Sequence, residues 1–411
     1  MTRSLLADTR EIGLDDTENT NISVIIPARD CGDHLERVLE ALKHQTLRPN
    51  EVVIVDSSDS DSAEAIISDY QSTSRIIYKK VKKAYPGEAR NIGVEIANGD
   101  WIGFLDCKTL PEDDWLDKCS RLASAYHSDL VFGMGKFEAR TPFQKSLRAA
   151  TYGLVGHHTV PGTLVKKIAF GQSGGFQGHL RAGEDIEWRD RIIDQGLKIH
   201  FLDEPVIKYL GLPKTFLLTI KKYFISARHT ARANILVNLK NVYLSLFLIF
   251  LTILAAKWNA LIGWDEDSVL YLPHITKLYL LSILLLFLLY RLIRFFYSFG
   301  NLDKTLTITM KFIIFVLFSG LIYRWNEIFA GWVEDAVWYV PHITKIYVGT
   351  LVSLSIFYRG ILLPLKRAVS PSFLFPVKWV QVGILGLSLD LAKAPGYVYG
   401  AIVTMSRGFR L

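Results

Sequence analysis

The first half of the chain alternates short hydrophobic runs with amphipathic stretches. Runs rich in β-branched residues predict buried strands at 22–27, 51–56, 75–78 and 101–106. Apolar residues at helical spacing predict helices over 35–42, 63–70 and 87–97. Because strands alternate with helices, we expect an α/β domain with a mainly parallel sheet.

Polar residues gather where the predicted strands end, at Pro27–Asp30, Asp56–Asp61 and Asp106–Lys108. Ligands of such sheets bind beyond the carboxyl ends of the strands, so we expect one site built from these three segments. Carboxylates there suit ribose hydroxyls, a base N–H or a divalent cation. Taken singly, each carboxylate is equally typical of a turn or a helix cap.

The second half of the chain contains four long apolar segments, at 241–256, 278–299, 305–323 and 346–365. Their uncharged cores are shorter than the roughly 17–25 residues of a full membrane span. They reach that length if the flanking Lys and Arg side chains extend to the membrane surfaces. We therefore predict four transmembrane helices, with re-entrant or interfacial hairpins as the alternative.

An internal repeat supports two hairpins. Residues 264–279 recur as 332–347, and both copies end in Pro-His-Ile-Thr-Lys followed by an aliphatic residue and Tyr. Acidic residues gather in these tips, whereas Lys and Arg gather at the opposite ends of the apolar segments. The positive-inside rule then predicts tips outside the cell membrane and a cytosolic N-terminal domain.

Charge and cysteine content narrow the class of protein. Residues 1–210 carry 26 Lys and Arg against 32 Asp and Glu, whereas residues 211–411 carry 21 against 8. The basic residues flank apolar stretches instead of clustering around a domain that could recognise nucleic-acid bases. This argues against nucleic-acid binding. The polar first twenty residues do not resemble a signal peptide. Cys31, Cys107 and Cys119 lack CxxC spacing, which argues against a disulfide scaffold or a zinc module and fits a reducing compartment.

Four motifs in order carry a resemblance to a known family. They are Ser-Val-Ile-Ile-Pro-Ala-Arg-Asp at 23–30, the segment 51–62 with its Asp-Ser-Ser-Asp, the segment 87–106 that ends in Phe-Leu-Asp, and Ala-Gly-Glu-Asp at 182–185. Over roughly residues 21–205 the chain resembles family 2 glycosyltransferases. The resemblance implies a GT-A, Rossmann-like fold and inverting transfer of a sugar from a nucleotide donor.

The resemblance also implies roles for individual residues. Asp56 would contact the base or ribose, Arg90 a phosphate, and Asp106 a metal ion; Asp185 would be the catalytic base, assisted by Glu184. The predicted nucleotide-sugar-binding residues are Pro27, Ala28, Arg29, Asp30, Asp56, Ser58, Gly87, Arg90, Asp106 and Lys108. An inverting reaction needs such a base opposite the leaving group, and like-charge coupling to a neighbour raises a carboxyl pKa. An acidic helix N-terminus is the structural alternative for Glu184 and Asp185.

One position departs from the family pattern. The expected Asp-x-Asp is Asp106-Cys107-Lys108 here, with lysine in place of the second carboxylate. This leaves a Mg²⁺ or Mn²⁺ cofactor in doubt. Three interpretations follow: a metal held by Asp106 alone, metal-free catalysis with Lys108 neutralising the diphosphate, or an inactive site.

The acceptor is less well specified. After Asp185 there is no Gln-x-x-Arg-Trp, which processive synthases of the superfamily carry, so single-sugar transfer is favoured. The candidate acceptor residues are His157, His158 and Arg181, with ordinary surface positions as the alternative. We expect a UDP-sugar donor and a lipid-linked or glycan acceptor at the cytosolic leaflet. The alternatives are a polyprenyl-phosphate glycosyltransferase and a non-catalytic membrane scaffold.

The predicted organisation runs as follows: a flexible tail over 1–20, the glycosyltransferase domain over 21–210, a basic amphipathic linker over 211–240, an all-α membrane domain of two helical hairpins over 241–365, and interfacial helices over 366–411. Lys and Arg of the linker would seat the first domain on anionic head groups.

Overall fold

A computed structural model gives the structure of the chain. It describes residues 21–59, 62–68, 70, 75–231, 254, 258–263, 265–273, 317, 320–331 and 333–408. The described residues fall into two compact units. The first holds those up to Thr219 together with Pro364–Phe373; the second holds Ile220–Ala231, those between 236 and Leu363, and those from Leu374.

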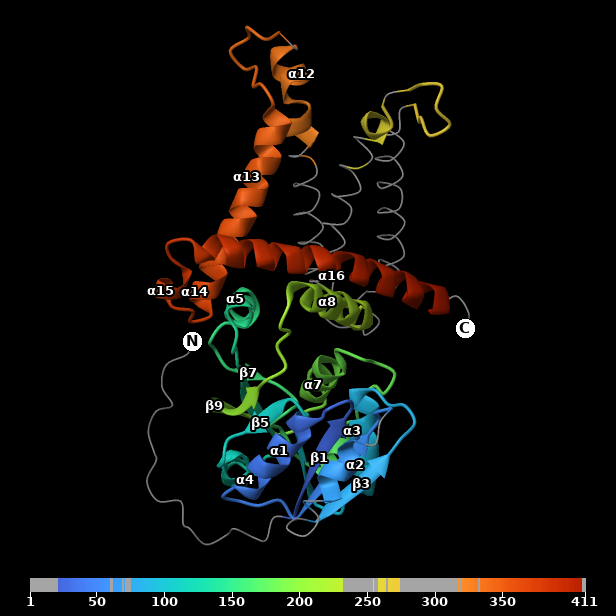
Figure 1. Cartoon of the computed structure of the whole chain (residues 1–411), viewed down its shortest axis with the longest axis vertical. Coiled ribbons are helices and arrows are strands. Elements are labelled where there is room, and N and C mark those ends of the chain that lie inside the picture. Colours follow the sequence, from blue (N-terminus) through green and yellow to red (C-terminus); the bar gives the residue numbers. More distant parts are fainter. Residues whose placement is uncertain are drawn as a thin grey trace. The chain divides into compact units, whose positions relative to one another are not determined.

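The first unit is built on a nine-stranded mixed sheet in the described part of the chain (Figure 1). The strands are β1 Ile22–Ala28, β2 Glu51–Asp56, β3 Ile76–Lys80, β4 Trp101–Phe104, β5 Thr109–Pro111, β6 Leu130–Phe137, β7 His157–His158, β8 Leu164–Lys166 and β9 Ile199–Tyr209. The order is β3-β2-β1-β4-β8-β6-β9-β5, with β7 paired to β6. The α/β, Rossmann-like prediction is therefore confirmed.

Helices of the first unit follow the strands. They are α1 Asp33–Lys43, α2 Ser62–Ser68, α3 Pro86–Ile96, α4 Trp115–Ala125, α5 Pro142–Thr151, α6 Lys167–Gln172 and α7 Glu184–Asp194; α8 Phe216–Thr230 continues into the second unit. Local sequence sets their ends. Pro86 opens α3, where a missing N–H costs nothing. Thr141 and Gln144 form a capping box at the start of α5.

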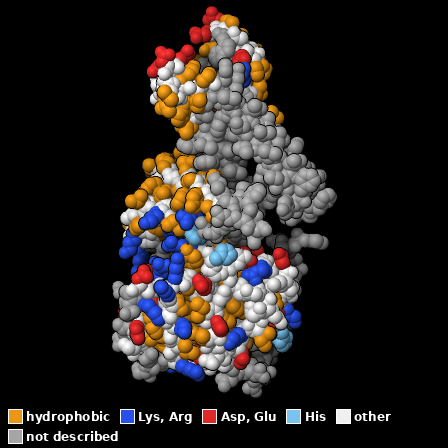
Figure 2. Space-filling model, turned by 90° about the vertical axis from the view of Figure 1, so that its right-hand side faces the viewer, with side chains coloured by type: hydrophobic (Ala, Val, Ile, Leu, Met, Phe, Trp, Pro, Cys, Tyr) orange, Lys and Arg blue, Asp and Glu red, His pale blue; other side chains and the backbone are white. Residues whose placement is uncertain are grey.

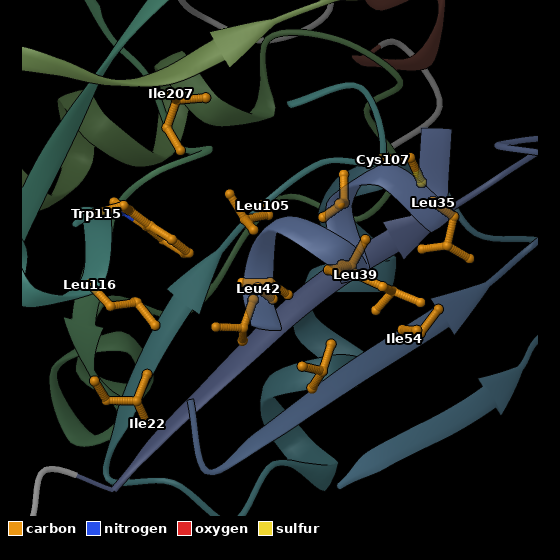
Figure 3. Packing of buried hydrophobic residues seen from close by; sticks show 14 of the residues in the cluster. Ile22, Leu35, Leu39, Leu42, Ile54, Leu105, Cys107, Trp115, Leu116 and Ile207 are labelled. Atoms are coloured by element: carbon orange, nitrogen blue, oxygen red, sulfur yellow. The ribbon is translucent and has the colours of Figure 1, made fainter. Parts of the chain in front are cut away.

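Two hydrophobic clusters cover the two faces of the sheet. Alternate side chains of β1 divide between them, because neighbouring residues of a strand point to opposite faces. Val24 and Ile26 face α1, α2 and α4, whereas Ile25 faces α3, α6 and α7. Figure 3 shows the first cluster, in which Leu35, Leu39 and Leu42 of α1 pack over the sheet. The result is a helix–sheet–helix sandwich.

The sheet is less parallel than predicted. The strands β3, β2, β1 and β4 are parallel, as expected. Beyond them β8 runs antiparallel to β4 and β6, and β5 runs antiparallel to β9. β5, β7 and β8 have two or three residues each and depend on pairing with residues distant in sequence, so no local hydrophobic run marks them.

The cysteine spacing argued against a disulfide scaffold, and the structure nevertheless contains one disulfide in the first unit. The structure joins Cys31 to Cys107 in a disulfide across 76 residues of sequence, and Cys119 is free and buried. Cys31 lies in the loop after β1, and Cys107 lies in the turn after β4. The bond therefore ties together two of the three strand ends that the sequence predicts to form the site.

The second unit contains α12 Trp325–Ala330, α13 Ile343–Phe357, a π-helical turn η1 Tyr358–Leu362 and the long α16 Lys378–Gly408. Between η1 and α16 in the sequence come α14 Leu363–Lys366 and α15 Pro371–Leu374, most of which belong to the first unit. Glycines allow α16 to pack closely on its neighbours in this unit. A Cβ at Gly383 would collide with the backbone of Ile356 in α13, and one at Gly400 with that of Arg228 in α8. Arg359 of η1 pairs with Asp390 of α16 at 2.8 Å.

The repeated segments form the same local structure twice. Asn259 and Asn326 each exchange two hydrogen bonds with the backbone thirteen or fourteen residues later, at Leu272 and Val340. The preceding Trp258 and Trp325 donate to Leu270 O and Trp338 O, both at 2.9 Å. Apolar side chains stay exposed on these tips. Acidic side chains lie beside hydrophobic ones at the top of the view in Figure 2.

Among the helices of the described residues, none is both long enough and apolar enough to cross a membrane. Of the four predicted spans, 278–299 lies outside the described residues, and so do all of 241–256 except Leu254 and most of 305–323. The fourth, 346–365, falls in α13, η1 and α14. The flexible tail over 1–20 also lies outside the described residues. The transmembrane hairpins remain a prediction.

The close contact between α3 and β1 gives a test of the packing. A Cβ at Gly93 would approach Ile25 Cγ2 to well within the sum of the two carbon van der Waals radii. We expect Gly93→Ala to lower the free energy of unfolding by about 1–3 kcal/mol, the usual scale of overpacking. Chemical denaturation of the full-length protein measures it.

The matched control is Gly171→Ala in α6, where a Cβ would meet nothing within 4 Å. It should leave stability unchanged or raise it, because alanine is the better helix former. Equal losses in both variants would contradict the packing described here.

Candidate active site

The three predicted strand ends do meet at one edge of the sheet. Register pairs Ala28 with Asp56 across β1 and β2, and β4 lies on the other side of β1. Backbone and side chains extend this junction: Asp30 N–H donates to Ser58 Oγ at 2.8 Å, and Ser58 Oγ donates to Asp56 Oδ1 at 2.5 Å. The loop after β1 is thereby joined to the end of β2.

Asp56 is fully buried and surrounded by donors. Its Oδ2 accepts from the Tyr78 hydroxyl at 3.0 Å and from Lys80 Nζ at 3.1 Å, and its Oδ1 also accepts the Ser58 N–H at 2.8 Å. Burial works to raise the pKa of Asp56, but the hydrogen bonds from Ser58, Lys80 and Tyr78 outweigh it and lower the pKa. Asp56 is therefore ionised and is held in one orientation at the carboxyl end of β2.

Tyr78 and Lys80 were not among the predicted site residues. They belong to β3, and the period-two spacing that places both beside Asp56 was present in the sequence. The residues Pro27, Ala28, Arg29 and Asp30 lie where predicted, at the end of β1 and in its loop. Arg29 and Asp30 are exposed, and Asp30 adopts a left-handed conformation with a φ of 50°.

A second group of charges forms around Arg90 of α3. One terminal nitrogen of its guanidinium lies 2.6 Å from Asp106 Oδ1, and the other lies 3.1 Å from Glu184 Oε1. The Arg90 and Glu184 side chains are 3% and 7% exposed, so this half of the bridge is almost wholly removed from water, whereas the Asp106 side chain is 32% exposed. Arg90 was predicted to contact a phosphate; in the structure its guanidinium lies against two carboxylates, and the phosphate contact stays a prediction.

Gly87 permits this bridge. A Cβ at that position would lie 3.0 Å from Phe176 Cβ and 3.1 Å from Glu184 Cγ. The first turn of α3 can thus approach the first residue of α7, one helical turn before Arg90. We therefore assign Gly87 a packing role beside the site, where the resemblance implied proximity to the nucleotide.

Glu184 and Asp185 open α7, after Gly183 in a left-handed conformation with a φ of 89°. Burial raises the pKa of Glu184 to about 7, Arg90 opposes this rise, and repulsion by Asp185 adds to it. Asp185 is half-buried, and its Oδ1 accepts the N–H of Ile186 at 2.9 Å. Glu184 is thus committed to Arg90, whereas the next carboxylate on the helix remains partly open to solvent.

Lys108 lies beside this group, on the turn that carries Asp106 and Cys107. Its side chain is exposed, and its backbone carbonyl accepts the N–H of Leu210 at 2.8 Å. Register places Thr109 opposite Tyr209 across β5 and β9. A Cβ at Gly211 would lie 2.6 Å from the Tyr209 hydroxyl and 3.1 Å from Lys108 Cδ, so both side chains run close to this glycine.

An aromatic cluster adjoins Tyr209. Phe137 stacks on Tyr152 with ring centroids 3.5 Å apart and meets Tyr209 edge-on at 4.8 Å. His157 lies 5.7 Å from the Tyr152 ring. Burial, Asp106 and Tyr152 together raise the pKa of Tyr209. Of these four rings, His157 alone was among the predicted site residues.

The two candidate histidines have different surroundings. His157 belongs to the aromatic cluster, whereas His158 contacts Leu202 O at 2.8 Å and packs edge-on against Phe201. They are neighbours on β7, so they point to opposite faces. Arg181 is exposed, two residues before Gly183. The structure therefore associates His157, but not His158, with the surroundings of Tyr209.

For a metal ion, Asp106 was the predicted ligand. Among the described residues, no group of three or more His, Cys, Asp or Glu side chains is arranged to hold one.

Comparison with known proteins agrees with the motifs. Residues 23–182 match Glycosyl transferase family 2. This part of the chain is therefore a family 2 glycosyltransferase domain, as its motifs predicted.

Among curated proteins, the chain is 25% identical over 198 residues to glycosyltransferase AglE of Haloferax volcanii, an alignment covering 45% of this chain and 65% of the relative. It is 26% identical over 116 residues to the poly(ribitol-phosphate) β-N-acetylglucosaminyltransferase TarP of Staphylococcus aureus, covering 27% of this chain and 36% of the relative. Both alignments thus leave a third or more of the relative unmatched.

Among solved structures, S. aureus TarS aligns with a TM-score of 0.39 and 18% identity, covering 61% of this chain and 46% of that one. The TarS 1–349 complex with UDP-GlcNAc aligns with a TM-score of 0.40 and 16% identity, covering 61% and 76%.

The Arg90 bridge gives a quantitative test. Arg90→Met leaves Asp106 and buried Glu184 without their cation, and breaking a buried pair in this way costs about 3–5 kcal/mol. We expect a loss on this scale in the free energy of unfolding, measured by denaturation of the full-length protein.

Arg121→Met is the control. Arg121 pairs with Asp117 one turn away on α4, but its side chain is 72% exposed. Removing an exposed pair should cost no more than about 1 kcal/mol. Similar losses for the two variants would mean that the bridge is not the buried interaction described.

Proposed function

We propose that the chain is an inverting, non-processive glycosyltransferase that moves one sugar from a nucleotide donor to an acceptor hydroxyl. The observation that carries this proposal is the position of Asp185. It is a half-buried carboxylate at the start of α7, one residue beyond the Arg90–Glu184 pair, within a site whose domain belongs to family 2.

The reaction follows from one general base. The acceptor hydroxyl oxygen attacks the anomeric carbon from the face opposite the diphosphate, and a new C–O bond forms. The bond between that carbon and the diphosphate oxygen breaks, and its electron pair leaves with the nucleoside diphosphate. The hydroxyl proton passes to Asp185. A single displacement of this kind inverts the anomeric configuration.

Glu184 supports this division of roles. It is 7% exposed and bound to Arg90, so it does not meet an acceptor directly. Asp185 is the next residue on α7 and is half-buried, so its carboxylate remains open to an acceptor hydroxyl. Asp185 is thus the catalytic residue, and Glu184 and Arg90 are positioning residues.

The donor side is the junction of β1 and β2. Asp56 and Ser58 line its floor, and the loop of Pro27–Asp30 rises beside them. Asp56 carries a fixed negative charge beneath this junction, where it holds Ser58, Tyr78 and Lys80 in position. A UDP-sugar is our default donor.

The acceptor side is the aromatic cluster around Tyr209. Aromatic rings offer a flat apolar surface with polar edges, which suits a sugar ring or a glycan chain. His157 adds a polar ring to this surface. The related proteins named as poly(ribitol-phosphate) glycosyltransferases, from S. aureus and Bacillus spizizenii, act on a polyol phosphate polymer, and this favours a glycan-type acceptor over a bare lipid phosphate.

We further propose that the chain is an integral membrane protein with its glycosyltransferase domain in the cytosol. The four apolar segments, the charge asymmetry along the chain and the exposed apolar tips support this. Val269 and Val337, at corresponding places in the two tips, are 99% and 92% exposed. Such side chains suit a membrane surface or its lipids.

Fractionation tests the membrane proposal. The full-length protein should sediment with membranes and stay there after an alkaline carbonate wash, and detergent should release it. Recovery in the supernatant of a low-salt lysate without detergent would contradict the proposal.

The catalytic proposal is tested by nucleoside-diphosphate release from the purified full-length protein. A panel of UDP- and GDP-sugars is supplied, with and without a membrane lipid extract as the acceptor source. We expect release from one donor. Asp185→Asn should lower the rate by about 10²–10⁴-fold, the usual contribution of a general base, while donor binding persists.

Asp190→Asn is the matched control. Asp190 lies on the same helix with its side chain 52% exposed, so its loss should leave turnover unchanged. Turnover that survives Asp185→Asn would remove Asp185 as the base. Release from no donor, even with lipid extract, would favour the non-catalytic scaffold.

A further inference from the structure

The turn after β4 does not fit the divalent cation that the family resemblance implies. Hard cations such as Mg²⁺ bind through oxygen ligands, with carboxylates supplying the negative charge. The turn offers Asp106 as its one carboxylate, and Lys108 occupies the position of the second. The donor set is therefore one carboxylate and one ammonium group.

One oxygen of the remaining carboxylate is already paired. Asp106 Oδ1 lies 2.6 Å from the Arg90 guanidinium, and the second partner of Arg90 is Glu184. A cation bound at Asp106 would lie within a few ångströms of that guanidinium, and two positive charges this close repel strongly in a partly buried site. Arg90 cannot swing away without leaving Glu184 buried and unpaired.

Lys108, in contrast, is a cation available for a ligand. Its side chain is exposed, and within the described residues no hydrogen bond or ion pair engages its ammonium group. Its backbone is held from both sides: the neighbouring Cys107 is bonded to Cys31, and the Lys108 carbonyl accepts from Leu210. The charge is thus presented from a fixed turn next to Asp106.

We propose that the ammonium group of Lys108 binds the diphosphate of the donor in place of a divalent cation, so that donor binding is independent of metal. This inference rests on the proposed function, since it concerns the leaving group of that reaction. A lysine ammonium is a compact point charge with three donors, which is suited to phosphate oxygens. It would offset the charge that develops on the departing diphosphate.

The experiment measures binding of UDP and of GDP to the full-length protein in detergent, by calorimetry, in chelator and in Mn²⁺. For the wild type, one nucleotide should bind with the same dissociation constant in both buffers. Lys108→Asp restores two carboxylates. In chelator it should weaken binding by about tenfold or more, the scale of a lost charged hydrogen bond, and Mn²⁺ should restore part of the affinity.

Two further variants separate charge from position. Lys108→Gln should weaken binding in both buffers with no restoration by Mn²⁺, because it supplies no carboxylate. Lys198→Asp makes the same change of charge at an exposed residue just before β9, at the opposite end of that strand from Tyr209, and should behave as the wild type. Lys108 is exposed, so its variants should keep the circular dichroism spectrum of the wild type.

The possible outcomes separate a failure of the Lys108 inference from a failure of the proposed glycosyltransferase function. Wild-type binding that is lost in chelator and recovered in Mn²⁺ would overturn the metal-independent role of Lys108 while supporting a nucleotide site. Unchanged affinity of Lys108→Asp in chelator would overturn it as well. Absence of UDP and GDP binding in both buffers would instead contradict the proposed function, and the inference would fall with it.

Discussion

The arrangement of the site depends on one buried cation. Arg90 holds Asp106, at the end of β4, and Glu184, at the start of α7, within hydrogen-bonding distance of the same guanidinium. Without that charge the two carboxylates and neighbouring Asp185 would repel one another at the sheet edge, and burial would make the repulsion stronger. The bridge therefore sets how closely α7 can approach the strand ends.

The same bridge decides which acidic residues are available for chemistry. Asp56, Asp106 and Glu184 are each engaged by partners within the domain, and they shape the site rather than react. Asp185 is the carboxylate at this edge that stands next to the bridge and is partly open to solvent.

The sequence predicted the parallel half of the sheet well, because each of its strands is a short hydrophobic run that closes at a polar turn. β1 was predicted at 22–27 and runs from Ile22 to Ala28, and β2 was predicted with its observed bounds. β5, β7 and β8 were not predicted, since strands of two or three residues exist through their partners alone. The internal repeat was also visible in sequence, because its Trp-Asn pairs and loop residues recur at fixed spacing.

The sequence allowed us to predict which residues form the site, but not which of them contact one another. The motifs identified Asp56, Arg90, Asp106 and Glu184, yet nothing local indicates that Arg90 would meet two carboxylates or that Cys31 would meet Cys107. Those contacts link residues between 16 and 94 positions apart, and the fold alone brings them together.

The departure from the family pattern at Lys108 can be understood from the charges around Arg90. A lysine in place of the second aspartate leaves Asp106 as the single carboxylate of the turn, so that Arg90 pairs with two carboxylates, Asp106 and Glu184, rather than three. The lysine and the bridge are thus two parts of one charge balance, in which positive charge comes from side chains of the chain itself.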